Sequence, residues 1–109
     1  MNKTLEKQIK KSFCEALCDY KSAKDVDIFL SDFLTDSEYS TLVKRLAVAY
    51  WLRKGRSYTN IMENLKASSA TIASVKNIID TAGMQSILAN MEAEEWANVW
   101  TKRIRKLVG

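Results

Sequence analysis

The stretch Ser57–Lys76 has the sequence SYTNIMENLKASSATIASVK and decides the fold. Ser57 and Ser68 are both suited to cap a helix, because a serine hydroxyl accepts a hydrogen bond from an early backbone amide. Apolar residues at helical spacing follow each cap, which predicts one helix over 58–65 and a second over 69–80. A turn of three residues joins them. Two short helices joined in this way form a helix-turn-helix motif.

In such a motif the second helix can lie in the major groove of DNA and present its first turn to base edges. Small side chains allow a close approach, hydroxyls donate or accept hydrogen bonds, and methyl groups can meet thymine. Other side chains would touch phosphates and fix the docking. The same pattern also fits a corner of a helical bundle that never meets DNA. The candidate DNA-binding residues are Thr59, Asn60, Lys66, Ser68, Ser69, Ala70, Thr71, Ala73, Ser74 and Lys76.

Four further helices are predicted around this motif. Thr35 and Glu38 have the spacing of a capping box, which starts a long central helix. Gly55 ends that helix after Lys54. The other three are predicted over 3–20, 25–33 and 85–107, with a break at 81–83. A chain of 109 residues with 3 glycines and no proline fits one all-α domain over 1–109 with six helices.

Composition argues against several classes of function. Histidine is absent, which removes the commonest general base and the commonest metal ligand, so neither a catalytic residue, a metal nor a cofactor is expected. Cys14 and Cys18 are expected to be small core residues, buried or half-buried. The chain has no segment long enough to span a membrane and no signal-peptide pattern, so the cytoplasm is the expected location.

Charge is unevenly distributed along the chain. The net charge is +4, yet acidic residues predominate over 19–38. A polyanion would be repelled by that segment and attracted to the basic residues that follow it. These are Arg53, Lys54, Arg56, Lys66 and Lys76, and then the cluster Lys102, Arg103, Arg105 and Lys106.

The segments Leu34-Thr35-Asp36-Ser37-Glu38, Arg45, Arg53-Lys54-Gly55 and Ser68-Ser69-Ala70-Thr71-Ile72, held in register, resemble the Trp repressor family. The resemblance covers about 25–79 and is closest to uncharacterised members with S-x-A-T-I at the start of the second motif helix. It implies an intertwined homodimer. Helices within 1–55 and 85–107 would build its shared core, and the helix-turn-helix over 57–80 would dock on a palindromic operator in double-stranded DNA.

The effector site departs from the family pattern. Thr35 and Arg45 match effector-contacting positions in tryptophan-binding members, although a helix cap and an ion pair would also explain them. A stacking arginine of those members is replaced here by Ser74, and the glycine after it by Val75. Tryptophan is therefore not the expected effector, and the identity of any small-molecule effector is unknown. Lys66 stands where the family turn has glycine. A left-handed lysine would cost about 1 kcal/mol, so the turn is expected to be either strained or slightly rebuilt.

Two hypotheses about function follow. The first is a repressor-like, sequence-specific transcriptional regulator, favoured by the basic residues around the motif. The second is an all-helical dimerisation or adaptor module that has lost DNA binding, favoured by the sparse charge on the second motif helix. An enzyme is not expected, because no pairing of nucleophile with base and no phosphate loop is present.

Overall fold

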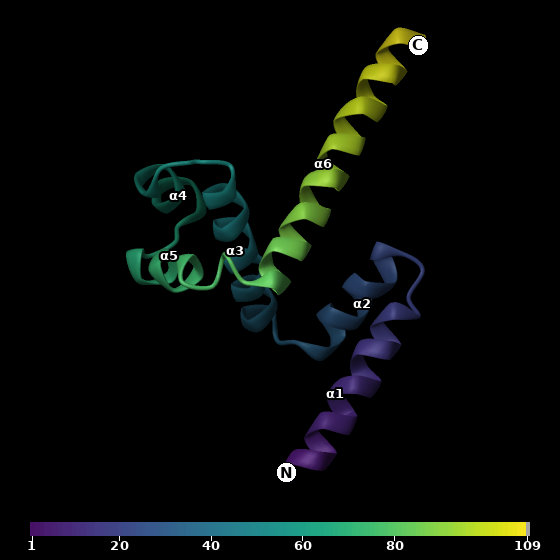
Figure 1. Ribbon diagram of the computed structural model, residues 1–109. Helices are drawn as coiled ribbons and strands as arrows, with labels where there is room; N and C mark the ends of the chain where they lie inside the picture. The colour runs from purple at the N-terminus through teal and green to yellow at the C-terminus, as the bar shows by residue number, and fades with distance from the viewer. Residues whose placement is uncertain (109) are drawn as a thin grey trace. The chain divides into compact units, whose positions relative to one another are not determined.

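The computed structural model describes the backbone of residues 1–108 and the side chains of residues 1–97. Over this part the chain is helical, without strands, which confirms the predicted all-α class and the order of six helices (Figure 1). The helices are α1 (Lys3–Cys18), α2 (Ala23–Phe33), α3 (Asp36–Arg53), α4 (Tyr58–Leu65), α5 (Ser69–Lys76) and α6 (Ala82–Val108).

The predicted helix boundaries at Ser57, Ser68 and Gly55 agree with the structure. Ser57 accepts from the Asn60 amide at 3.1 Å, and Ser68 accepts from the Thr71 amide at 3.1 Å. Gly55 ends α3 with a φ of 83°, in the left-handed region that glycine tolerates. The start of α2 was predicted two residues late, because Ser22 caps this helix by accepting from the Asp25 amide at 3.2 Å.

The link between α5 and α6 differs from the prediction. Helix α5 ends at Lys76 rather than near residue 80, and α6 begins at Ala82, so the predicted break at 81–83 is wrong. The non-helical segment covers 77–81 instead. Thr81 stabilises it by donating its hydroxyl to the Ile78 carbonyl at 2.7 Å, and its own carbonyl accepts from the Gln85 amide at 2.9 Å.

The chain divides into two compact units, residues 1–41 and residues 42 onward. In the first unit an aromatic cluster joins α1 to α2. The Phe29 ring lies 5.7 Å from that of Phe13 and 5.6 Å from that of Phe33, measured between centroids. The Tyr39 hydroxyl, at the start of α3, donates to Asp27 Oδ1 at 2.8 Å. No residue of α1 or α2 is buried in the single chain.

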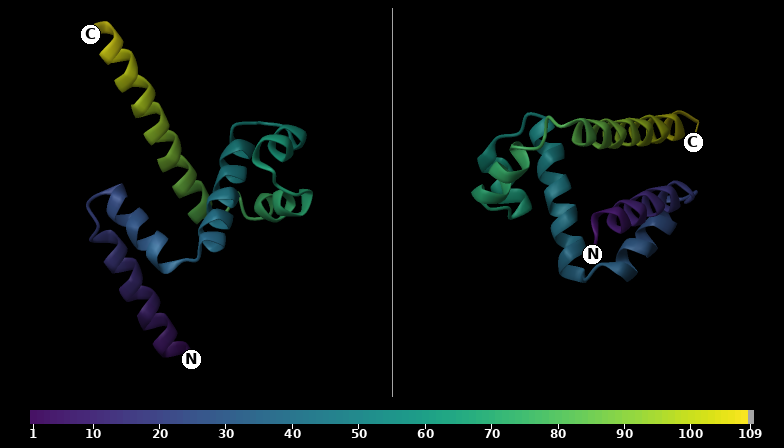
Figure 2. Two further views of the ribbon diagram at one scale, coloured as in Figure 1. Left: turned by 180° about the vertical axis from the view of Figure 1, so that it is seen from behind. Right: turned by 60° about the horizontal axis from the view of Figure 1, so that its bottom comes forward.

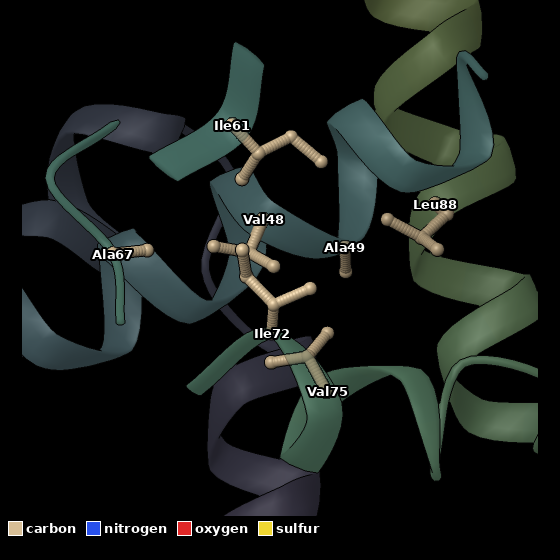
Figure 3. Close-up of a cluster of buried hydrophobic side chains, with 7 residues drawn as sticks. All are labelled: Val48, Ala49, Ile61, Ala67, Ile72, Val75 and Leu88. Atoms are coloured by element: carbon tan, nitrogen blue, oxygen red, sulfur yellow. The ribbon is translucent and has the colours of Figure 1, made fainter. Parts of the chain in front are cut away.

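The second unit contains the hydrophobic core. Figure 2 shows α4 and α5 side by side, next to the C-terminal half of α3. Branched aliphatic side chains from these helices and from the start of α6 pack together (Figure 3). Ala67, in the turn of the motif, belongs to the same buried cluster. The core residues are Val48, Ala49, Ile61, Ala67, Ile72, Val75 and Leu88. The core therefore fixes the helix-turn-helix onto α3.

Three further expectations concern the periphery. Cys14 and Cys18 are exposed, so their predicted core role is wrong for the single chain, because no element of the first unit covers their face of α1. No described helix is both long and apolar enough for a membrane span. Among the described side chains, no cluster of three or more potential ligands could hold a metal ion. The basic cluster at 102–106 lies outside the described side chains.

Candidate nucleic-acid interface

Helix α5 has one buried face and one exposed face. Ile72 is 0% exposed and Val75 is 1% exposed, and both pack into the core of the second unit. The opposite face consists of small residues that lie at the surface: Ser69, Ala70, Ala73 and Ser74. Because α5 is anchored by its apolar face, its small side chains are presented outward on a rigid element.

The start of α5 is held by paired hydroxyl groups. Ser68 Oγ accepts from the Thr71 backbone amide at 3.1 Å and lies 3.0 Å from Thr71 Oγ1, within hydrogen-bond distance. Thr71 is half-buried, unlike the other small residues of this face. Its hydroxyl lies within hydrogen-bond distance of Ser68 Oγ, so this hydroxyl already has a partner inside the protein.

The turn of the motif adopts a strained backbone. Lys66 has φ 54° and ψ 37°, which is left-handed, so of the two expected outcomes the turn is strained rather than rebuilt. Lys44, on α3, donates its Nζ to the Lys66 carbonyl oxygen at 3.3 Å. Ala67 is 5% exposed and belongs to the core. Burial of Ala67 in the core and the hydrogen bond from Lys44 therefore both hold the turn in place.

Two polar residues, Thr59 and Asn60, lie in the first turn of α4, the first helix of the motif. Thr59 is exposed. Asn60 is half-buried, and its Oδ1 accepts from Arg56 Nη1 at 3.2 Å while its backbone carbonyl accepts from Asn64 Nδ2 at 2.8 Å. The guanidinium carbon of Arg56 lies 4.0 Å from the centroid of the Trp51 ring. The Asn60 side chain therefore already has one partner, Arg56, at the surface of the protein.

Lys76 ends α5 beside a shallow cavity. Its Nζ lies 5.3 Å from the centroid of the Tyr58 ring, and a hydrogen bond with the Tyr58 side chain raises the pKa of Lys76 above its usual range. Lys76 is exposed and stays positively charged at neutral pH. The neighbouring cavity has a volume of about 370 Å³ and is lined by Leu52, Arg53, Tyr58, Lys76, Ile79, Asp80 and Gln85.

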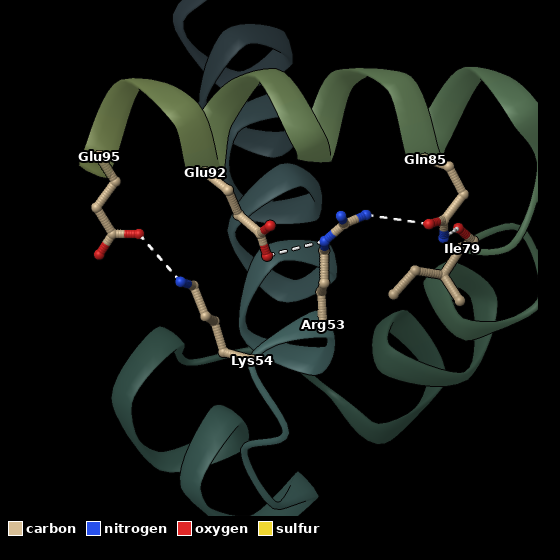
Figure 4. A network of polar contacts seen from close by, with 6 residues as sticks. All are labelled: Arg53, Lys54, Ile79, Gln85, Glu92 and Glu95. Carbon is tan, nitrogen blue, oxygen red and sulfur yellow. Dashed lines mark hydrogen bonds and ion pairs between the residues drawn. The ribbon is translucent and has the colours of Figure 1, made fainter. Parts of the chain in front are cut away.

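Two of the basic residues expected to attract a polyanion instead connect α3 to α6. Arg53 Nε lies 2.9 Å from Glu92 Oε1, and Arg53 Nη1 donates to Gln85 Oε1 at 3.0 Å. Lys54 Nζ lies 3.4 Å from Glu95 Oε2. Figure 4 shows these contacts running along one side of α6. Because carboxylates compensate the charges of Arg53 and Lys54, the uncompensated positive charge near the motif comes mainly from other basic residues.

Sequence reasoning missed Lys44, and it named Arg56 only as one of a group of basic residues. Both contact the motif through single hydrogen bonds, to Lys66 and to Asn60 respectively. Lys44 had no distinguishing feature in the sequence. Arg56 had one, because it directly follows the glycine that ends α3 and directly precedes the serine that caps α4.

Thr35 and Arg45, which match effector-contacting positions of the family, both form hydrogen bonds with other residues of the protein. Thr35 and Glu38 form the predicted capping box: Glu38 Oε1 accepts from the Thr35 amide at 2.9 Å, and Thr35 Oγ1 accepts from the Glu38 amide at 3.1 Å. The bond from the Thr35 amide lowers the pKa of Glu38 below its usual value. In the second unit, Arg45 Nη1 donates to Ser74 Oγ at 3.4 Å, where an ion pair had been the alternative expectation.

Comparisons with known proteins agree with this architecture. The family model described as Trp repressor protein matches residues 8–92. The uncharacterised protein YerC of Bacillus subtilis (strain 168) is 34% identical over 65 residues, which are 60% of this chain; the chain thus matches 62% of that relative's length. The crystal structure of a candidate Trp repressor from Staphylococcus aureus superposes with a TM-score of 0.71 and 26% identity, covering 78% of this chain and 87% of that one. The chain belongs to the Trp repressor family.

Proposed function

We propose that this protein is a sequence-specific DNA-binding transcriptional regulator of the repressor type, with α4 and α5 docking on a duplex operator. Membership of the Trp repressor family supports a DNA-binding regulator. The observation that carries the proposal is the two-faced character of α5. Its apolar face is locked into the core by Ile72 and Val75, while its other face is exposed and small enough to enter a major groove.

The roles of individual residues follow from where the motif places them. The outward face of α5 and the Thr71 methyl group would contact base edges, and Ser68 would hold the helix start that approaches them. Residues at the ends of the two motif helices would contact phosphates. The residues proposed to contact bases are Ser69, Ala70, Thr71, Ala73 and Ser74. Those proposed to contact phosphates are Thr59, Asn60, Lys66 and Lys76.

A homodimer is part of the proposal. Leu5, Ile9 and Phe13 repeat every four residues along α1 and are 45%, 51% and 44% exposed. Phe33, at the end of α2, is 71% exposed. Exposed large apolar side chains in such a row are typical of an interface, and a second copy of the chain would cover them. Sedimentation equilibrium at micromolar concentration should give twice the mass of 12.4 kDa, and a folded monomer would contradict the proposal.

Tryptophan is not the proposed effector. Ser74 provides no cation to stack over an indole, and its hydroxyl accepts a hydrogen bond from Arg45. Val75 is buried in the core, so its methyl groups occupy space that a glycine would leave open. The hydrogen bond from Arg45 to Ser74 connects α3 directly to α5. We therefore propose a regulator that binds DNA without tryptophan.

Selection of bound duplexes from a random DNA pool tests the proposed function. The expected result is enrichment of a palindromic sequence whose binding weakens steeply as salt rises, because phosphate contacts release counterions. The alternative, a dimerisation or adaptor module, is favoured by α5 carrying a single charged residue, Lys76. A dimer that enriches no sequence and shifts no duplex, even at low salt, would decide for that alternative.

A further inference from the structure

Arg56 differs from its basic neighbours at the end of α3. Arg53 and Lys54 each lie within 4 Å of a carboxylate of α6, at 2.9 and 3.4 Å. No described carboxylate forms an ion pair with Arg56. Its side chain is exposed, yet two contacts hold it: its guanidinium carbon is 4.0 Å from the Trp51 ring centroid, and its Nη1 donates to Asn60 Oδ1 at 3.2 Å.

The backbone explains part of this arrangement. The Arg56 amide donates to the Trp51 carbonyl at 3.1 Å, and the Gly55 amide donates to the Leu52 carbonyl at 3.0 Å. This is the hydrogen-bond pattern of a Schellman motif, in which the residue after the left-handed glycine usually makes an apolar contact with the last turn of the helix. An apolar side chain would suffice for that contact. Here the position carries an arginine whose charged end lies on the indole face.

The second contact fixes the direction of the charged group. Asn60 lies in the first turn of α4, and its Oδ1 takes up one of the five N–H donors of the guanidinium. The other donors of this exposed group can still bind an acceptor. An arginine that is already stacked and hydrogen-bonded loses less side-chain freedom when it binds a phosphate than a mobile one does.

The position of Arg56 in the motif indicates the acceptor. It directly precedes Ser57, which caps α4, and in a helix-turn-helix complex the first helix crosses the DNA backbone while the second enters the groove. We infer that Arg56 is a preorganised contact for a backbone phosphate of duplex DNA, and that Trp51 and Asn60 are the positioning residues that hold it. This inference rests on the proposed function, and it gives Asn60 an indirect role.

The test compares variants by fluorescence anisotropy on one duplex, at a series of salt concentrations. Arg56→Ala should weaken binding about tenfold, the effect of losing one charge-assisted hydrogen bond. It should also reduce the slope of log affinity against log salt by about one. Arg56→Lys should restore the slope and only part of the affinity, because an ammonium lacks the planar fork. Lys10→Ala, which removes one charge from the exposed surface of α1, is the control and should leave the slope unchanged.

The role of Asn60 is tested by a double-mutant cycle. Asn60→Ala should weaken binding in the wild-type background and add little in the Arg56→Ala background, because it acts through Arg56. Full additivity would overturn the positioning role. An Arg56→Ala variant that melts at a lower temperature but keeps the wild-type salt slope would show that the residue only terminates α3. If the wild-type protein binds no duplex, the proposed function fails and this inference fails with it; if the wild-type protein binds DNA but Arg56→Ala keeps its slope of log affinity against log salt, the proposed function stands and this inference is wrong.

Discussion

Replacing Lys66 with glycine should stabilise the fold. The backbone of Lys66 is left-handed, with φ 54° and ψ 37°, and this conformation costs an L-residue about 1–2 kcal/mol. Glycine would relieve that cost but would give the unfolded chain about 0.4–1 kcal/mol of extra conformational entropy. The hydrogen bond from Lys44 goes to the backbone carbonyl of Lys66 and would survive the substitution. The net expectation is a gain of about 0.5–1 kcal/mol in the free energy of unfolding.

Urea denaturation and thermal melting measure this gain. Lys66→Gly should raise the melting temperature by about 2–4 °C without changing the urea m-value. Lys66→Ala is the matched control, because it removes the same side chain and keeps the strain, so it should not be more stable than wild type. Both variants lose the same charge and should weaken DNA binding equally. If Lys66→Gly is no more stable than Lys66→Ala, the reasoning from backbone strain is wrong.

Gly55 allows the opposite change at the other end of the motif. It has φ 83°, and a Cβ added there would meet no atom within 4 Å, so any cost of Gly55→Ala comes from the backbone alone. We expect a loss of about 1 kcal/mol. Opposite signs for the two substitutions, measured in the same urea series, would identify torsion rather than packing as the cause.

Three other predictions concern the capping box, the effector and the recognition helix. Glu38 has a lowered pKa, so its contribution to stability is present above the ordinary carboxyl pKa and is lost as the pH falls through the lowered value. Glu38→Gln should therefore flatten the acid side of a stability–pH curve measured by urea denaturation. Calorimetric titration with millimolar L-tryptophan should give no saturable heat, because the buried Val75 side chain occupies space that a glycine would leave open and Ser74 supplies no cation. A stoichiometric signal would refute this. Lys76→Ala should weaken binding to all duplexes alike and reduce the salt slope, whereas Thr71→Ala should alter the preference among operators. Identical behaviour of these two variants would exclude base contacts by α5.

The parts of the fold that were predictable from the sequence are those governed by local chemistry. Ser57, Ser68 and Gly55 mark helix ends correctly because each acts on amides or torsions within a few residues. The end of α5 was misplaced because no strong cap stands there. The segment 77–81 is ordered by the Thr81 hydroxyl and by the Gln85 side chain, which donates to the Ile79 carbonyl at 2.7 Å.

The position of the helix-turn-helix was predictable from the sequence, but the contacts of the residues around it were not. Whether a basic residue is available to a polyanion depends on partners far away in the sequence. Arg53 pairs with Glu92, 39 residues later, and no local pattern indicates that pair. For the same reason the sequence could not distinguish Arg56, which has no ion pair among the described residues, from its two neighbours.

The separation of α5 into a buried and an exposed face has a consequence for how binding preference can evolve. Surface positions away from structural contacts usually tolerate substitution within about 0.5 kcal/mol. Ser69, Ala70 and Ala73 are exposed, and their side chains are small enough to be replaced by larger ones without entering the core. On the proposed function, the preference for DNA sequence could therefore change at these positions while Ile72 and Val75 keep the scaffold intact. On the same proposal, mutations on the exposed face of α5 are the ones expected to redirect the protein to a new operator.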